Sequence, residues 1–179
     1  MLRPGLEQQP MLLIREPLTP SALDDVRSLM RAFVAWHRER HVEDLDLVER
    51  YFDGPAFDAE LAALPGKYAR PKGRLLIAYH DEQPAGCVAL RDLGEGICEM
   101  KRMFVPTARR GRGIGRALAV DIIAEARAAG YRRMRLDTSK RQREAMRLYE
   151  RAGFRRVPPY YDLPDEMTDW LVFFELTLQ

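Results

Sequence analysis

The chain turns from a predicted strand into a predicted helix at Val105-Pro106-Thr107-Ala108-Arg109-Arg110-Gly111-Arg112-Gly113-Ile114-Gly115-Arg116, and this stretch decides the fold. Glycines at 111, 113 and 115 let the backbone turn tightly and leave its N–H groups open to a ligand. The helix that follows adds unpaired N–H donors and the positive end of its dipole. The stretch therefore predicts a phosphate-binding turn.

The spacing of these glycines separates the turn from two better-known phosphate-binding loops. A P-loop requires G-x-x-x-x-G-K-[ST] and a dinucleotide fingerprint requires G-x-G-x-x-G, whereas this chain has G-x-G-x-G followed by Arg-Ala. Neither pattern matches. A turn that serves only to cap the helix, with its arginines on a solvated face, remains the alternative at this point.

Apolar periodicity on both sides of the turn predicts a mixed α/β fold. Three strands separated by turn residues form an antiparallel meander, and a strand, helix, strand unit around the turn forms a parallel crossover. The predicted strands span residues 11–16, 75–79, 86–90, 97–105, 132–138, 154–157 and 170–178. The predicted helices span residues 20–41, part of 45–64, 114–129 and 142–152.

Composition indicates one folded domain. The chain has 179 residues, of which 46% are hydrophobic and 31% charged, with a net charge of +2. We expect a flexible terminus over residues 1–10 and a single domain over 11–179. Cys87 and Cys98 suggest neither a disulfide framework nor a zinc site, and no stretch is typical of a signal peptide or a membrane span. We therefore expect a cytoplasmic protein.

Charge is distributed unevenly along the chain. Seventeen Lys or Arg residues and five Asp or Glu residues lie between Lys101 and Arg156, whereas His41 to Glu60 holds seven acids and one arginine. A basic second half requires an anionic partner, such as nucleic acid, a membrane surface or a phosphate-bearing small molecule. Aromatic residues are not interleaved with the arginines, which disfavours nucleic acid.

Two motifs together carry a family resemblance. Arg110-Gly111-Arg112-Gly113-Ile114-Gly115 is similar to the R/Q-x-x-G-x-G/A signature of the GCN5-related N-acetyltransferases (GNAT). Ala145-Met146-Arg147-Leu148-Tyr149-Glu150-Arg151-Ala152-Gly153-Phe154 resembles their A-x-x-L-Y-E-x-x-G-F motif. The resemblance covers roughly residues 11–178. It implies a sheet whose central strands, 97–105 and 132–138, splay apart to admit acetyl-CoA, the co-substrate.

The resemblance also implies site residues. Backbone groups of the strand end would pair with the pantetheine arm, and N–H groups of the turn would hold the pyrophosphate. The cofactor-binding residues implied are Met103, Phe104, Val105, Arg110, Gly111, Arg112, Gly113, Ile114, Gly115 and Arg116. Gln142 replaces a frequent asparagine and would reach the pantetheine with a longer arm. Tyr149 would be the general acid that protonates the departing thiolate.

Glu99 is the second catalytic candidate. Family members that acetylate lysines carry a glutamate six residues before the last valine of the strand, and Glu99 stands six before Val105. A carboxylate there would take the proton from the acceptor amine, directly or through water. The alternative is a structural ion pair with Lys101 or Arg102. Tyr160 and Tyr161, in a proline-rich tail, either line the acceptor site or cover the core.

These observations predict an N-acetyltransferase that acts by direct transfer from acetyl-CoA to a primary amine of a small molecule or peptide. A catalytically silent CoA-binding regulator is the alternative, followed by a basic nucleic-acid-binding protein. We expect no membrane association and leave a homodimer open. The acidic stretch from Glu43 to Glu60 suggests a cationic acceptor. His37 and His41 have the spacing of metal ligands, but no third ligand is evident and we predict no metal.

Overall fold

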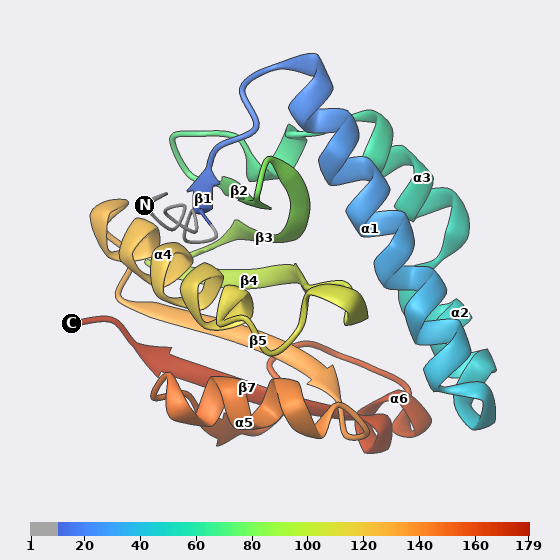
Figure 1. Ribbon diagram of the computed structural model, residues 1–179. Helices are drawn as coiled ribbons and strands as arrows, with labels where there is room; N and C mark the ends of the chain where they lie inside the picture. The colour runs from blue at the N-terminus through green and yellow to red at the C-terminus, as the bar shows by residue number, and fades with distance from the viewer. Residues whose placement is uncertain (1–10) are drawn as a thin grey trace, which may run out of the picture.

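A seven-stranded sheet forms the centre of the molecule (Figure 1). The computed structural model describes residues 11–179, so the expected flexible terminus lies outside the described residues. The strand order is β1-β2-β3-β4-β5-β7-β6, and only β4 and β5 pair in parallel. This is the predicted meander followed by a strand, helix, strand crossover. The mixed α/β fold class is confirmed.

The strands are β1 (Leu12–Arg15), β2 (Arg74–His80), β3 (Gln83–Gly94), β4 (Ile97–Phe104), β5 (Arg133–Ser139), β6 (Arg155–Val157) and β7 (Leu171–Thr177). The α-helices are α1 (Pro20–Arg40), α2 (Leu45–Phe52), α3 (Gly54–Ala62), α4 (Ile114–Ala128), α5 (Arg143–Arg151) and α6 (Asp165–Trp170). Helix α6 was not predicted. It follows the proline-rich tail and has only six residues, which is too short for apolar periodicity to indicate a helix.

Helices cover both faces of the sheet, and strand side chains alternate between them. Leu75 and Ile77 of β2 face the core beneath α1, α2 and α3, whereas Leu76 and Ala78 face α4 and α5. Period-two alternation of this kind places successive side chains on opposite faces. Burial of each large aliphatic side chain contributes about 1.5–3 kcal/mol, so the two cores fix the sheet on which the site is built.

Local signals explain where two helices begin. The Thr19 side chain caps α1 by accepting a hydrogen bond from the Ala22 N–H at 3.2 Å, and Pro20 occupies the first turn. Helix α4 begins after Gly113, whose φ of 77° lies in the left-handed region that glycine tolerates. The glycine-rich turn thus directs α4 away from the end of β4.

Candidate active site

Strands β4 and β5 separate part of the way along the sheet. They pair only from Ile97 to Glu99 on β4, where Glu99 is opposite Arg135. Beyond that point β4 bulges against β3, and Arg102 takes a φ of 56° in the left-handed region. A bulge bends a strand and increases its local twist. The opening of the central strands that the family resemblance implies therefore coincides with a bulge at Arg102.

Glu60 of α3 holds the bulge in place. Arg102 donates two hydrogen bonds to the Glu60 carboxylate, at 2.8 and 3.0 Å, and lies over the rings of Phe52 and Phe57. Burial acts to raise the pKa of Glu60, but the bonds and charge of Arg102, with those of Lys67, lower that pKa to about 2. The carboxylate stays ionised, so the anchor persists at any ordinary pH.

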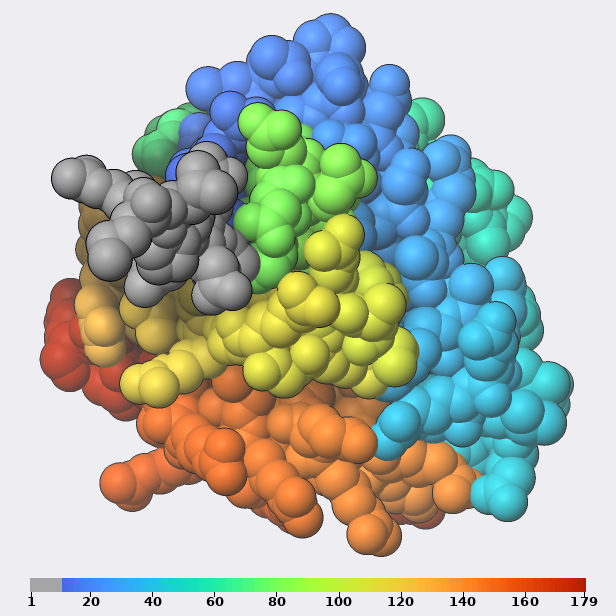
Figure 2. Space-filling model, viewed as in Figure 1, coloured from blue at the N-terminus to red at the C-terminus, as the bar shows by residue number. Residues whose placement is uncertain are grey.

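A groove of about 540 Å³ runs from the end of β4 across the glycine-rich turn to α5. Figure 2 shows the face on which α1, the turn and α5 come together. The groove is lined by every cofactor-binding residue implied by the resemblance except Arg112: Met103, Phe104, Val105, Arg110, Gly111, Gly113, Ile114, Gly115, Arg116 and Gln142. Arg112 is exposed outside the lining.

The turn itself leaves room for an anion. Gly111 and Gly113 both have positive φ, and a Cβ built at either position meets no heavy atom of the described residues within 4 Å. The first N–H groups of the 15-residue helix α4 follow directly. Such an N-terminus, with open space in front of its donors, is a site for phosphate.

Arg110 lies across the groove. Its Nε donates to the Val105 carbonyl at 3.0 Å, and its guanidinium stacks on the Trp36 ring at 4.4 Å. The Val105 carbonyl is thereby occupied by a side chain. Pairing of Val105 with a pantetheine amide, as the resemblance implies, requires Arg110 to release this bond.

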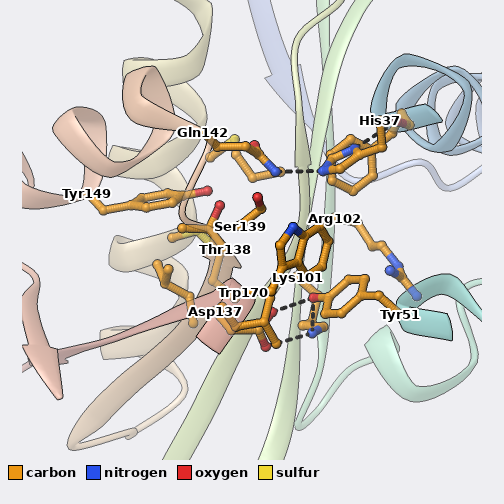
Figure 3. Close-up of a pocket in the computed structure, with 15 residues that line it drawn as sticks. His37, Tyr51, Lys101, Arg102, Asp137, Thr138, Ser139, Gln142, Tyr149 and Trp170 are labelled. Carbon is orange, nitrogen blue, oxygen red and sulfur yellow. Dashed lines mark hydrogen bonds and ion pairs between the residues drawn. The ribbon is translucent and has the colours of Figure 1, made fainter. Parts of the chain in front are cut away.

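Tyr149 lies where the groove meets the opening between the strands. Its ring packs against Phe154 and Phe174 at centroid distances of 5.9 and 6.1 Å. The side chain lines both the groove and a smaller cavity of about 40 Å³ between β4 and β5. Burial, followed by the nearby charge of Asp137, raises the pKa of the Tyr149 phenol. The hydroxyl points toward the inter-strand cavity (Figure 3).

His37 holds the amide of Gln142. Burial lowers the pKa of His37 to about 4, even though its hydrogen bond to the Phe33 carbonyl acts in the opposite direction. The neutral ring therefore donates from Nδ1 to Phe33 at 3.0 Å and accepts at Nε2 from the Gln142 amide at 2.6 Å. The amide is fixed at the wall of the groove (Figure 3).

This arrangement predicts a loss of stability in mild acid. The unfolded histidine binds its proton near pH 6.5 and the native one near pH 4, so protons favour the unfolded state between these values. We expect the free energy of unfolding to fall by about 2 kcal/mol between pH 7.5 and pH 5. Urea titrations at the two pH values measure this, and His37→Gln removes most of the difference. If His37→Gln loses as much free energy of unfolding as the wild type between these pH values, His37 is not the group responsible.

An ionic network lies at the other side of the inter-strand cavity (Figure 3). The Lys101 Nζ is 3.2 Å from Asp137 Oδ2 and 3.1 Å from the Tyr51 hydroxyl, which also donates to Asp137. Tyr161 donates to the same carboxylate at 3.1 Å. Sequence reasoning missed Tyr51, Lys101 and Asp137 as site residues, because only the pairing of β4 with β5 and the packing of α2 bring them together.

Glu99 is fully buried and ion-paired with Arg91. Arg91 Nε donates to Glu99 Oε2 at 2.5 Å, and the Tyr160 hydroxyl donates to Oε1 at 2.7 Å. Of the two partners considered from the sequence, Lys101 is 3.9 Å away and Arg102 is paired with Glu60 instead. Arg91, from the neighbouring strand β3, is the close partner. Glu99 does not line the groove or either adjoining cavity.

A third cavity, also of about 540 Å³, lies on the α2 and α6 side of the sheet. Arg91, Arg135, Tyr160 and Tyr161 contribute to its walls. It shares Tyr51, Lys101 and Arg102 with the inter-strand cavity, which in turn shares Met103, Gln142 and Tyr149 with the groove. The three spaces form a series through the opened sheet.

The groove at the glycine-rich turn is thus joined through the split sheet to a cavity on the other side. The sequence profile described as Acetyltransferase (GNAT) family matches residues 36–154. The chain therefore belongs to the GNAT family and has the acyltransferase fold of that family.

Similar proteins agree with this assignment. An N-acetyltransferase of Schizosaccharomyces pombe is 41% identical over 109 residues, which are 60% of this chain and 67% of that protein. An acetyltransferase from Streptococcus agalactiae has a TM-score of 0.70 at 22% identity, covering 93% of this chain and 98% of that one. An N-acetyltransferase from Thermoplasma acidophilum, solved in complex with coenzyme A, has a TM-score of 0.69 at 15% identity, covering 93% and 99%.

No helix within residues 11–179 combines the length and the apolar character that crossing a bilayer requires.

Proposed function

We propose that this chain transfers an acetyl group from acetyl-CoA to a primary amine by direct attack in a ternary complex. The observation that carries the proposal is the position of Tyr149, which lines both the groove and the cavity between the opened strands. The structure of the Thermoplasma acidophilum relative with coenzyme A supports the choice of co-substrate. The thioester supplies the acetyl group. The residues of this chain position the two substrates and protonate the departing thiolate.

The groove residues hold the co-substrate in this proposal. N–H groups from Arg110 to Arg116 bind the pyrophosphate at the start of α4. The backbone of Met103 to Val105 pairs with the pantetheine amides as an added strand would. The pantetheine then passes the Gln142 amide and places the thioester in the inter-strand cavity. Open space at Gly111 and Gly113 fits a phosphate at the turn.

Three side chains move protons. Tyr149 donates its phenolic proton to the sulfur of the departing thiolate, because its raised pKa keeps it protonated throughout the neutral range. Glu99 accepts the proton of the amine. Both of its oxygens are engaged, so this proton reaches it through the Tyr160 hydroxyl, which passes its own proton to Oε1. Tyr160 lines the cavity on the α2 and α6 side but not the inter-strand cavity, so water carries the proton from the amine to the Tyr160 hydroxyl.

Binding and turnover are tested separately. CoA at a hundredfold excess over its Kd stabilises folding by about 2.7 kcal/mol if it binds only the native state, which thermal unfolding detects. Thiol release from acetyl-CoA is then followed with a panel of amines. Absence of stabilisation at millimolar CoA overturns the co-substrate assignment. Stabilisation without amine-dependent release across the panel identifies a binding module rather than an enzyme.

A further inference from the structure

The cavity on the α2 and α6 side has an unusual charge. Glu95 is the one acidic residue in its lining. Six cationic side chains line it: Arg50, Lys67, Arg91, Lys101, Arg102 and Arg135. An ammonium ion entering such a space is repelled, whereas an anion is attracted. The charge on the wall is therefore opposite to that expected for a cationic acceptor.

Arg91, Lys67 and Lys101 are each more exposed than the acid that pairs with them, whereas Glu175 is as exposed as Arg135 and Glu166 is more exposed than Arg50. None of these acids lines the cavity. The side chains of Glu99 and Asp137 are 0% exposed and that of Glu60 is 9% exposed, whereas Arg91 is 35% and Lys67 is 43% exposed. A ligand in the cavity therefore approaches the cations more closely than the carboxylates. Coulomb energy falls with distance, so the nearer charges dominate its binding.

Four of the seven acids in the stretch that suggested a cationic acceptor are paired with arginines. Glu43 and Asp44 pair with Arg141, and Glu49 pairs with Arg38. Glu60 pairs with Arg102 at the bulge. These carboxylates are engaged in structural contacts and do not form an open acidic surface toward the cavity.

We propose that the acceptor is an amine that also carries a carboxylate, and that Arg91 and Arg135 bind this carboxylate. The inference deepens the proposed function and rests on it. Arg91 and Arg135 flank Glu99 in adjacent strands, since Arg91 pairs with Glu99 across β3 and β4 and Glu99 pairs with Arg135 across β4 and β5. Paired residues point to the same face of a sheet, so both guanidinium groups stand on the cavity side.

Both arginines are held in place by contacts made through Nε. Arg91 Nε bonds Glu99 at 2.5 Å, and Arg135 Nε bonds Glu175 at 2.7 Å. The Arg135 guanidinium also stacks on the Tyr160 ring at 5.0 Å. A guanidinium has five N–H donors in a planar fork. The donors on the terminal nitrogens are thus available for a carboxylate, and the side chains that carry them are already ordered.

The amine end of the same molecule then reaches the reaction. Lys101 lies two residues beyond Glu99 on β4, about 7 Å along the strand, and lines both this cavity and the inter-strand cavity. A carboxylate several bonds from the amine, such as the γ-carboxylate of glutamate, spans more of this distance than an α-carboxylate, which is two bonds from the amine. The cationic surroundings also lower the pKa of its ammonium group, which favours the neutral amine that attacks the thioester.

Paired acceptors test the inference. Thiol release is measured with glycine against glycinamide and with glutamate against its α-amide, its γ-amide and its diamide. We expect the carboxylates to be preferred on the order of tenfold or more in kcat/KM, since a charge-assisted hydrogen bond contributes about 1.5–3 kcal/mol. The two monoamides show whether the α- or the γ-carboxylate carries the preference. Equal turnover of acids and amides overturns the inference and leaves the proposed function standing.

Arg135→Gln should abolish the preference for carboxylate over amide, mainly through KM. Arg133→Gln is the matched control, because Arg133 lies on the same strand and contacts the same Glu175 at 3.6 Å but does not line the cavity. Arg91→Lys, which retains a cation beside buried Glu99, should reduce the preference without removing it. An unchanged preference in Arg135→Gln contradicts the assignment. Failure of every amine to release thiol overturns the proposed function as well.

Discussion

Tyr149→Phe should lower kcat about a hundredfold and leave the Kd for CoA nearly unchanged. The substitution keeps the ring, and with it the contacts to Phe154 and Phe174, so the packing of α5 is preserved. It deletes the phenolic hydroxyl. Of the two catalytic candidates, Tyr149 and Glu99, only Tyr149 lines both the groove and the inter-strand cavity. Loss of a positioned general acid costs about 10²- to 10⁴-fold in rate.

The lower end of that range is expected because of the leaving group. A thiol with a pKa near 8.5 departs as thiolate without help far more readily than an alkoxide would. The burial that raises the pKa of Tyr149 keeps its hydroxyl protonated well above neutral pH. Its deprotonation therefore contributes no alkaline limb to the rate profile between pH 6 and pH 10.

Tyr131→Phe is the matched control for Tyr149→Phe. Tyr131 is also a buried tyrosine, 7% exposed, but its hydroxyl donates to the Lys72 carbonyl at the far end of β5. Steady-state rates with a true acceptor, together with CoA titrations, distinguish the two. Wild-type kcat and pH profile in Tyr149→Phe would remove Tyr149 from proton transfer and leave positioning as the source of catalysis.

Local sequence signals were sufficient for most of the fold. Helix α1 has its cap at Thr19 and its proline at position 20, and α4 follows a glycine whose left-handed conformation only a few residue types tolerate. These signals act over three or four residues, and apolar periodicity supplies the rest. The predicted groove residues other than Gln142 also lie close together along the chain, so the turn brings them together without information from distant segments.

Partners across strands could not be predicted in the same way. Glu99 and Arg91 are eight residues apart along the chain, and the register between β3 and β4 brings them together. Arg102 contacts Glu60 because α3 packs over the bulge. The sequence suggested Lys101 and Arg102 as ion-pair partners of Glu99 because they lie nearby along the same strand. Register and helix packing depend on the whole sheet, and a single sequence carries no direct record of either.

The charge of the cavity on the α2 and α6 side illustrates the same limit. The acidic composition of residues 43–60 suggested a cationic acceptor, yet Glu60 turns inward to Arg102. The cavity instead receives Arg91 from β3 and Arg135 from β5. Composition along a segment reports which charges are present, whereas the fold decides which of them face a ligand.

Gly113→Val should weaken CoA binding about 10- to 150-fold while the protein remains folded, the loss expected when a hydrogen bond to a charged phosphate, worth about 1.5–3 kcal/mol, is blocked. Gly113 has a φ of 77°, and forcing a β-branched residue into that region costs about 1–3 kcal/mol. A Cβ at this position has no neighbour within 4 Å, so the new side chain does not clash with the protein. It occupies the open space in front of the first N–H groups of α4, where the phosphate is proposed to bind.

Two further variants separate strain from obstruction in this prediction. Gly130→Val places the same residue at a φ of 86° beyond the other end of α4, again with nothing within 4 Å of the Cβ, and should cost stability without changing the Kd for CoA. Gly113→Asn tolerates the left-handed backbone but still fills the space before the N–H groups. If the turn binds phosphate, Gly113→Asn loses affinity with little loss of stability, as isothermal titration and urea unfolding would show. Wild-type affinity in a folded Gly113→Val protein would reduce the turn to a helix cap and move the pyrophosphate elsewhere in the groove.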